Sequence, residues 1–245
     1  RDRYNGGSVH RTVRRRDSVI LGIIPARAGS TGVPNKNLVN GPLFHGRPLV
    51  TWAVHEALMS KHLDSLVVST NDVATARELG AMPRVQIHRR DDRISGPDSP
   101  TEATLGAVIA QYPADEYMLL QLTSPTRMAE DIDAAIGYFH YQRWDSMVSV
   151  VPDYGFTWHE GTDTAVGNYE PKNRSMRQEQ HMWKENGAIY MFTHELWERE
   201  HCRLGGTIGL FKMQRHHAIE VDEPMDLVLA EAALAFHRRK MYEVR

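Results

Sequence analysis

The chain has 245 residues and a mass of 27.9 kDa, which is enough to enclose one sizeable hydrophobic core. Hydrophobic residues make up 41% of it and charged residues 24%, as is typical of globular proteins. The longest apolar run, residues 19–25, is far shorter than the roughly 20 residues that a membrane-spanning helix needs. The net charge of -2 gives no general attraction to nucleic acid or membranes. We therefore expect neither as a partner.

The N-terminal segment differs from the rest of the chain in charge. Its first 16 residues contain six arginines and one acidic residue, Asp2, with few apolar side chains. We interpret residues 1–17 as a flexible, solvated tail, with a basic docking arm or part of a targeting segment as the alternatives. Residues 18–245 are predicted to form a single domain. Because Cys202 is the single cysteine, no intrachain disulfide can form, and we expect a reducing, cytoplasmic environment.

Short apolar runs alternate with amphipathic segments up to about residue 151, as they do in repeated strand–helix–strand units. Residues 19–24 are continuously apolar, which is typical of a parallel strand buried on both faces. In chain order, the pattern predicts a strand at 19–24, a helix at 49–61, a strand at 65–69, a helix at 72–80, strands at 85–88 and 117–122, a helix at 130–141 and a strand at 146–151. This order predicts a three-layer, doubly wound α/β fold around a mostly parallel sheet.

A further helix is expected to begin near residues 98–102. Ser99 fits the N-cap position, Pro100 the first helical position and Glu102 the third position of a capping box. This local explanation competes with any role of Ser99 in binding a ligand.

The sequence changes character after Val151. Residues 152–186 are polar and poor in aliphatic side chains, so we expect a small inserted region that serves as a lid, a dimerisation arm or both. Residues 187–192 and 208–213 are predicted to return to the sheet as strands. A last helix is expected at about 224–240.

The loop after the first strand carries the strongest chemical signal. It runs over residues 24–37 and contains Gly29 and Gly32, which let the backbone approach a phosphate closely. Arg27 and Lys36 add a planar and a point-like cation, which suit a triphosphate. Ligands of open α/β sheets lie beyond the carboxyl ends of the strands. The loop lacks both the Walker A pattern and the three-glycine dinucleotide fingerprint, so it disfavours a kinase or an NAD enzyme.

Two acidic residues near the C-terminus are candidates for a metal site. Glu220 and Asp222 stand two residues apart in a segment predicted to be extended, so their side chains project to the same side. Carboxylates that converge near a triphosphate favour Mg²⁺. Alternatively, Asp222 or Asp226 only caps the last helix, which begins near Pro224.

With these motifs in order, the chain resembles the CMP-sialic acid synthetase family, which is similar in outline to the CMP-KDO synthetases. The resemblance covers about residues 20–234, and the Lys36–Asn37 pair favours the sialic-acid branch. It is carried by the segments 24–37, 119–127, 177–178, 186–190 and 219–222, and by Arg90 and Ser99.

The resemblance implies a nucleotidyltransferase-like fold, Mg²⁺ as the cofactor and transfer of CMP from CTP to an acidic nine-carbon sugar, in a homodimer. The implied nucleotide-binding residues are Ala26, Arg27, Ser30, Lys36, Asn37, Arg90, Ser99 and Gln121. The implied sugar-binding residues are Gln121, Arg177 and Tyr190. The implied metal ligands are Glu220 and Asp222, and the implied catalytic residues are Arg27, Lys36 and Asp222. Tyr190 is equally explained as a core residue, since it lies in an apolar strand.

Several departures from the family pattern keep the acceptor open. Members of the family mostly carry Asp where Glu220 stands, the loop 40–47 is longer than usual, and residues 153–161 lack a lysine that would grip the sugar carboxylate. KDO, legionaminic acid, pseudaminic acid and a phosphonate are the alternative acceptors. A nucleotide-binding protein without catalytic activity and a nucleic-acid binder acting through Arg14–Arg16 are the alternatives from other classes.

Overall fold

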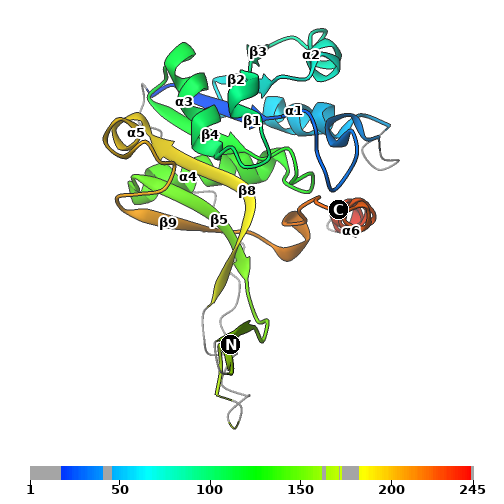
Figure 1. The fold of residues 1–245 in the computed structure, drawn as a ribbon, viewed down its shortest axis with the longest axis vertical. Coiled ribbons are helices and arrows are strands. Elements are labelled where there is room, and N and C mark those ends of the chain that lie inside the picture. Colours follow the sequence, from blue (N-terminus) through cyan, green and yellow to red (C-terminus); the bar gives the residue numbers. More distant parts are fainter. Residues whose placement is uncertain (1–17, 41–45, 162–163, 171, 173–181, 244–245) are drawn as a thin grey trace.

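The computed structural model describes residues 18–40, 46–161, 164–170, 172 and 182–243, with the side chains of 238–243 left out. These residues build a sheet of seven strands in the order β3-β2-β1-β4-β8-β5-β9. The strands are β1 (Ile20–Pro25), β2 (Ser65–Thr70), β3 (Val85–Arg89), β4 (Glu116–Leu120), β5 (Ser146–Pro152), β8 (Trp183–Thr193) and β9 (Ile208–Lys212). The apolar runs of β1, β2 and β4 are buried on both faces, as is typical of strands covered by helices, whereas the edge strands β3 and β9 are partly exposed (Figure 1).

Helices cover the two faces of the sheet. The α-helices are α1 (Leu49–Met59), α2 (Val73–Leu79), α3 (Thr101–Gln111), α4 (Ala129–Gln142), α5 (His194–Glu200) and α6 (Pro224–Glu243). One hydrophobic cluster joins the sheet to α1, α2, α4 and α6, and a second joins the opposite face to α3 and α5. The predicted three-layer α/β fold is therefore confirmed.

The sheet is mostly parallel, with β8 as the exception among the described strands. It pairs antiparallel with both β4 and β5, so the fourth and fifth predicted strands are not neighbours. The sequence predicted that residues 187–192 return to the sheet, but not that they would separate two earlier strands. Periodicity reports burial, whereas strand order depends on pairing between segments that are far apart in the chain.

The helix predicted near residue 98 begins differently from the prediction. Pro100 is at the N-cap position of α3, and no side chain caps this end of the helix. The predicted capping box at Ser99 and Glu102 is therefore wrong. Glu102 instead forms an ion pair with Arg203. Ser99 thus has no capping role that would explain its presence.

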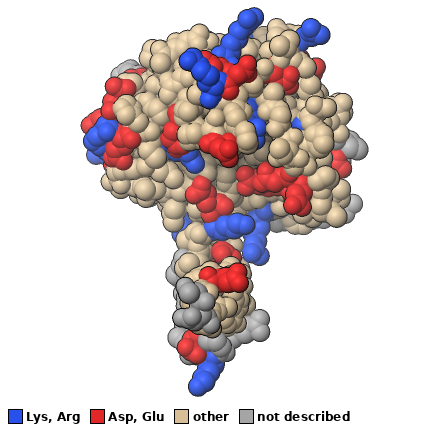
Figure 2. Space-filling view, in the orientation of Figure 1, with Lys and Arg blue, Asp and Glu red and all other residues tan. Residues whose placement is uncertain are grey.

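The predicted insertion begins as an extension of the sheet. The ends of β5 and β8 stay paired beyond the body of the molecule, from Val150 opposite Glu185 to Pro152 opposite Trp183. A small hairpin of β6 (Trp158–Glu160) and β7 (Ala165–Gly167), which the sequence did not predict, follows. Figure 1 shows the described residues of this 152–186 arm, which are 152–161, 164–170, 172 and 182–186, standing away from the sheet, and Figure 2 shows them in a narrow projection below the rounded body.

No helix in the described part of the chain is long and apolar enough to cross a membrane. Residues 1–17 and Arg177 lie outside the described residues.

Candidate functional site

A cavity of about 220 Å³ opens at the carboxyl ends of the central strands. The strand order runs from β1 to β2 and β3 on one side and from β1 to β4 on the other, so the cavity lies where the direction of winding reverses. This switch point is the expected ligand site of an open α/β sheet. The lining residues are Pro25, Arg27, Ser30, Lys36, Asn37, Arg90, Ser99, Thr101, Thr104, Gln121, Leu122, Thr123 and Asp222.

The loop after β1 meets the C-terminal acidic segment at this cavity. The Lys36 ammonium donates to the backbone carbonyl of Val221 at 2.6 Å and pairs with Asp222 Oδ1 at 3.2 Å. Gly32 is required at the same junction, because a Cβ there would clash with the backbone carbonyl of Asp222. Residues separated by 185 positions in the chain are thus held together by a largely buried lysine. The site requires this meeting, which the sequence alone did not show.

Asn37 fixes the shape of the loop. Its side-chain amide donates to the carbonyls of Ala26 and Arg27 at 3.2 and 3.1 Å and to Thr75 Oγ1 at 3.2 Å. Ala26 is itself buried, and its N–H donates to the Ser69 carbonyl at 2.8 Å, which continues the pairing of β1 with β2. Ala26 is not among the lining residues, although Pro25 and Arg27 on either side of it are.

Two arginines face the cavity without an acidic partner. Within the described residues, neither Arg27 nor Arg90 forms an ion pair with a carboxylate. The Arg27 guanidinium donates to the Gly29 carbonyl at 3.2 Å, and Arg90 donates to the Ile94 carbonyl through Nε at 3.0 Å. Burial, followed by the positive charge of Arg27, lowers the pKa of Arg90. Two guanidinium groups that repel each other at one cavity make an environment that favours an anion.

Glu220 and Asp222 form an acidic pair in the segment that Lys36 contacts. Burial and then the charge of Asp222 raise the pKa of Glu220, so the two carboxylates are close enough to repel each other. Glu220 does not line the cavity; it lies beside Gly187, whose φ of 67° and small size leave room for the Glu220 carboxylate. Such a repelling pair of oxygen donors fits a divalent cation.

Capping of α6 is explained by Asp226 rather than by Asp222. Asp226 Oδ2 accepts the backbone N–H groups of Asp222 and Glu223 at 2.9 and 2.7 Å, just before α6 begins. The side chain of Asp222 is 67% exposed and bonds Lys36, so it does not cap the helix.

Three threonines at the cavity were not among the predicted site residues. Thr101 and Thr104 come from the first turn of α3, and Thr123 follows β4. The hydroxyls of Thr104 and Thr123 are buried and have no hydrogen-bond partner in the described structure. Buried hydroxyls without a partner at a cavity are suited to bond a ligand. Thr123 lies in the segment 119–127 that carries the resemblance but was not singled out there, and Thr101 and Thr104 in α3 carry no sequence signal of their own.

The remaining predicted residues fall into two groups. Gln121, directly after β4, and Ser30 and Ser99 all line the cavity. Tyr190 is buried in the hydrophobic cluster on the face of the sheet that α3 and α5 cover. Its hydroxyl donates to Glu185, and the Arg203 guanidinium lies 4.6 Å from the centre of its ring. Burial is the main cause that raises the pKa of Tyr190. Its predicted role in sugar binding therefore stays a prediction, as does that of Arg177.

A fully buried arginine supports the base of the cavity. The Arg127 guanidinium donates to the carbonyls of Gln121 at 2.9 Å and Ala188 at 2.8 Å, which ties the end of β4 to β8. Burial lowers the pKa of Arg127 to about 10. Because its hydrogen bonds go to backbone carbonyls, we assign it a structural role at this site.

An anion-favouring loop at the switch point, with a carboxylate pair beside it, defines an α/β protein with a candidate site for a phosphate-bearing ligand. The chain belongs to the cytidylyltransferase family, whose sequence model matches residues 21–232. The chain is 31% identical over 225 residues to an N-acylneuraminate cytidylyltransferase of Oncorhynchus mykiss, covering 86% of this chain and 49% of that one. It is 28% identical to a CMP-N,N'-diacetyllegionaminic acid synthase of Legionella pneumophila, covering 91% and 99%. It thus spans about half the length of the first relative and nearly all of the second.

Solved structures confirm the nucleotidyltransferase-like fold. A CMP:2-keto-3-deoxy-manno-octonic acid synthetase, solved in complex with CTP, superposes with a TM-score of 0.68 at 18% identity, covering 90% of this chain and 100% of that one. A 4-diphosphocytidyl-2C-methyl-D-erythritol synthase gives a TM-score of 0.65 at 12% identity, covering 89% and 100%. At these identities the likeness establishes the fold alone.

Proposed function

We propose that the protein transfers CMP from CTP to the anomeric hydroxyl of a sialic-acid-type nonulosonic acid, with release of pyrophosphate. The observation that carries this proposal is the Lys36–Asp222 contact of 3.2 Å, which joins the loop after β1 to the acidic segment at one cavity. The names of the relatives, N-acylneuraminate cytidylyltransferase and CMP-N,N'-diacetyllegionaminic acid synthase, support the substrate class.

The cationic side of the cavity holds the phosphates in this proposal. Arg27 and Arg90 bind the triphosphate, and Lys36 stabilises the charge that grows on the departing pyrophosphate. Phosphoryl chemistry of this kind depends mostly on positioning and on neutralising charge. Support comes from the burial of Lys36 and Arg90, which are each 8% exposed, since charge interactions are stronger away from water. Asn37 and the backbone beside Ala26 bind the cytosine, and Ser30 and Ser99 add hydroxyls.

Asp222 and Glu220 would hold Mg²⁺ in this proposal. Burial, and then the charge of Asp222, raise the pKa of Glu220, which supports such a role, because a bound cation would offset both effects. When bound, Mg²⁺ polarises the α-phosphate and lowers the pKa of the attacking hydroxyl. Asp222 Oδ1 also accepts a hydrogen bond from the Lys36 ammonium. This contact orients the proposed metal ligand, Asp222, together with the proposed phosphate-binding cation, Lys36.

The acceptor lies next to Gln121 in this proposal, with Tyr190 nearby and Arg177 binding the sugar carboxylate through its planar guanidinium. The 152–186 arm joins two copies of the chain into a dimer. Exposed aromatic side chains support this use of the arm: Trp158 is 53% exposed, and Phe156 and Trp158 both contact Tyr169. A cytoplasmic location is also part of the proposal, and Cys202 as the single cysteine supports it.

The experiment is a panel of acceptors, with release of pyrophosphate measured in the presence of CTP and Mg²⁺. N-acetylneuraminic acid is expected to give a kcat/KM at least about tenfold above that of KDO and of a phosphonate, because a pocket that pairs the acceptor's polar groups rejects analogues that lack them. Highest activity with KDO or the phosphonate would contradict the proposed acceptor. Binding of CTP without pyrophosphate release for any acceptor would contradict catalysis itself.

Legionaminic acid is the second candidate acceptor. It is favoured by the near-complete match in length with the Legionella relative, of which the chain covers 99%. In the same panel, a kcat/KM for legionaminic acid above that for N-acetylneuraminic acid would select this candidate.

A further inference from the structure

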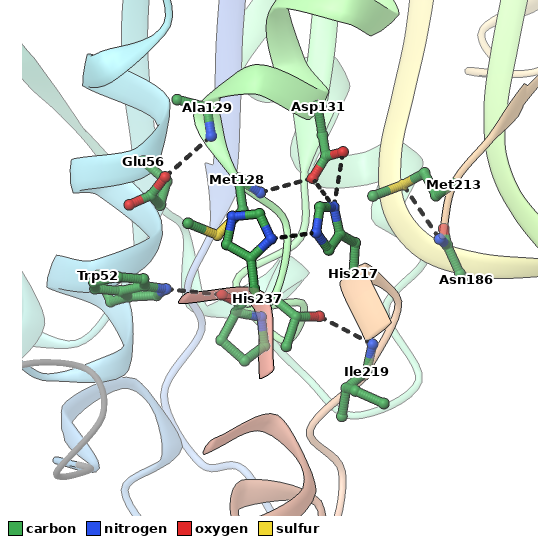
Figure 3. A network of polar contacts seen from close by, with 12 residues as sticks. Trp52, Glu56, Met128, Ala129, Asp131, Asn186, Met213, His217, Ile219 and His237 are labelled. Carbon is green, nitrogen blue, oxygen red and sulfur yellow. Dashed lines mark hydrogen bonds and ion pairs between the residues drawn. The ribbon is translucent and has the colours of Figure 1, made fainter. Parts of the chain in front are cut away.

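Three histidines cluster outside the cavity described above. His216 and His217 belong to a short 3-10 helix, Arg215–His217, and His237 lies on α6. One ligand nitrogen from each residue lies within 4.8 Å of the others. Figure 3 shows the rings of His217 and His237 facing each other, with Asp131 of α4 behind His217. None of the three histidines lines the cavity at the strand ends.

Asp131 fixes which nitrogen of His217 is available. His217 Nδ1 lies 3.0 and 2.9 Å from the two carboxylate oxygens of Asp131. An ionised carboxylate only accepts hydrogen bonds, so His217 Nδ1 carries a proton and Nε2 of the neutral ring holds a lone pair. That Nε2 points at His237 Nδ1, 2.9 Å away. A carboxylate behind the far nitrogen of a histidine is the arrangement that orients metal-binding imidazoles.

The spacing of the nitrogens suits a small transition-metal ion. Zn–N bonds of about 2.0–2.1 Å put tetrahedral ligand nitrogens about 3.4 Å apart. The 2.9 Å between His217 and His237 and the 4.8 Å limit for the whole group lie on either side of that value. Small ring rotations would therefore bring the three nitrogens into position. Imidazole ligands favour zinc, nickel or copper over magnesium.

We propose that His216, His217 and His237 bind one divalent transition-metal ion, such as Zn²⁺, with Asp131 orienting His217. Burial, and then the neighbouring His217, lower the pKa of His237, which favours its neutral ring. His237 Nδ1 donates to the lone pair of His217 Nε2 in the metal-free chain, so the ion displaces this hydrogen bond and the His237 proton moves to its Nε2. The bound ion stabilises the fold, since it links α6 to the segment that leads to Glu220. That segment is anchored beyond the histidines by Ile219, whose N–H donates to Thr126 Oγ1 at 3.1 Å. This inference is independent of the proposed function.

The test is titration of the metal-free full chain with Zn²⁺ by calorimetry, in excess Mg²⁺, and with Co²⁺ by visible absorption. The wild type is expected to bind one ion per chain, and Co²⁺ is expected to give the intense bands of a tetrahedral site. His237→Ala and His216→Ala are each expected to weaken Zn²⁺ binding at least about tenfold. Asp131→Asn keeps all three ligands and is expected to weaken it by about 10–100-fold. His62→Ala, which removes a partly buried histidine elsewhere, is the matched control and leaves binding unchanged.

Melting of the metal-free variants separates binding from folding. Each variant is expected to melt near the metal-free wild type, and Zn²⁺ is expected to raise the melting temperature of the wild type and His62→Ala more than that of His237→Ala. If His237→Ala does not fold, Asp131→Asn decides by its affinity alone. Wild-type-like Zn²⁺ affinity in the cluster variants, or a wild type with no stoichiometric site, would overturn the proposal.

Discussion

Lys36→Ala is expected to lower kcat for pyrophosphate release by about 100-fold or more, which is the usual effect of removing one preorganised group that stabilises transition-state charge. Lys36 is 8% exposed and bonds both Val221 and Asp222, so its ammonium is fixed before substrate arrives. The alanine variant loses the positive charge and also leaves the Val221 carbonyl without this bond. Steady-state kinetics with CTP at saturation measure the effect on kcat.

Two controls isolate the charge of Lys36. Lys61→Ala removes an exposed lysine elsewhere and is expected to leave kcat unchanged. Lys36→Met keeps most of the volume of the side chain and is expected to be as inactive as the alanine variant. Thermal melting of each variant shows whether the fold survives. Near-normal turnover in a folded Lys36→Met protein would remove Lys36 from the mechanism.

Asp222→Asn is expected to lower kcat/KM by about 100-fold and to raise the Mg²⁺ concentration needed for half-maximal activity. Loss of one carboxylate removes an anionic ligand from the proposed metal site and replaces the negatively charged partner of Lys36 at 3.2 Å by a neutral amide. Glu220→Gln is expected to act in the same direction. The measurement is activity as a function of Mg²⁺ for each variant.

The matched control for Asp222 is its near neighbour Glu223. Glu223→Gln makes the same change in charge one residue away, on an exposed side chain, and is expected to keep the wild-type Mg²⁺ dependence. An Asp222→Asn protein with unchanged Mg²⁺ dependence would show that the metal is held elsewhere.

The sequence predicted most elements of the fold because their apolar runs are long and continuous. The strand predicted at 19–24 is β1 at Ile20–Pro25, and the helix predicted at 130–141 is α4 at Ala129–Gln142. The position of β8 between β4 and β5 was beyond prediction, since it depends on pairing over long chain separations. The short helix α5 was missed because it begins directly after β8 and ends at His201 without a glycine, whereas the equally short α2 ends at Gly80, a recognisable stop signal.

The loop after β1 could be predicted as part of the site because its residues are adjacent in sequence. Its meeting with Asp222 required the fold, since the contact spans 186 positions. Ser99 shows how local rules can mislead: its spacing to Glu102 fits a capping box, yet Glu102 is drawn into an ion pair with Arg203 instead. Tertiary contacts thus overrode a valid local pattern, and Ser99 faces the cavity.

A crystal structure with CTP and Mn²⁺, in which the anomalous signal locates the metal, tests the central claim most directly. We expect the triphosphate to contact Arg27 and Lys36 in the cavity, with the metal bound to an oxygen of Asp222 and to the α-phosphate. A nucleotide bound away from the loop after β1, or a metal remote from both Asp222 and Glu220, would contradict the account.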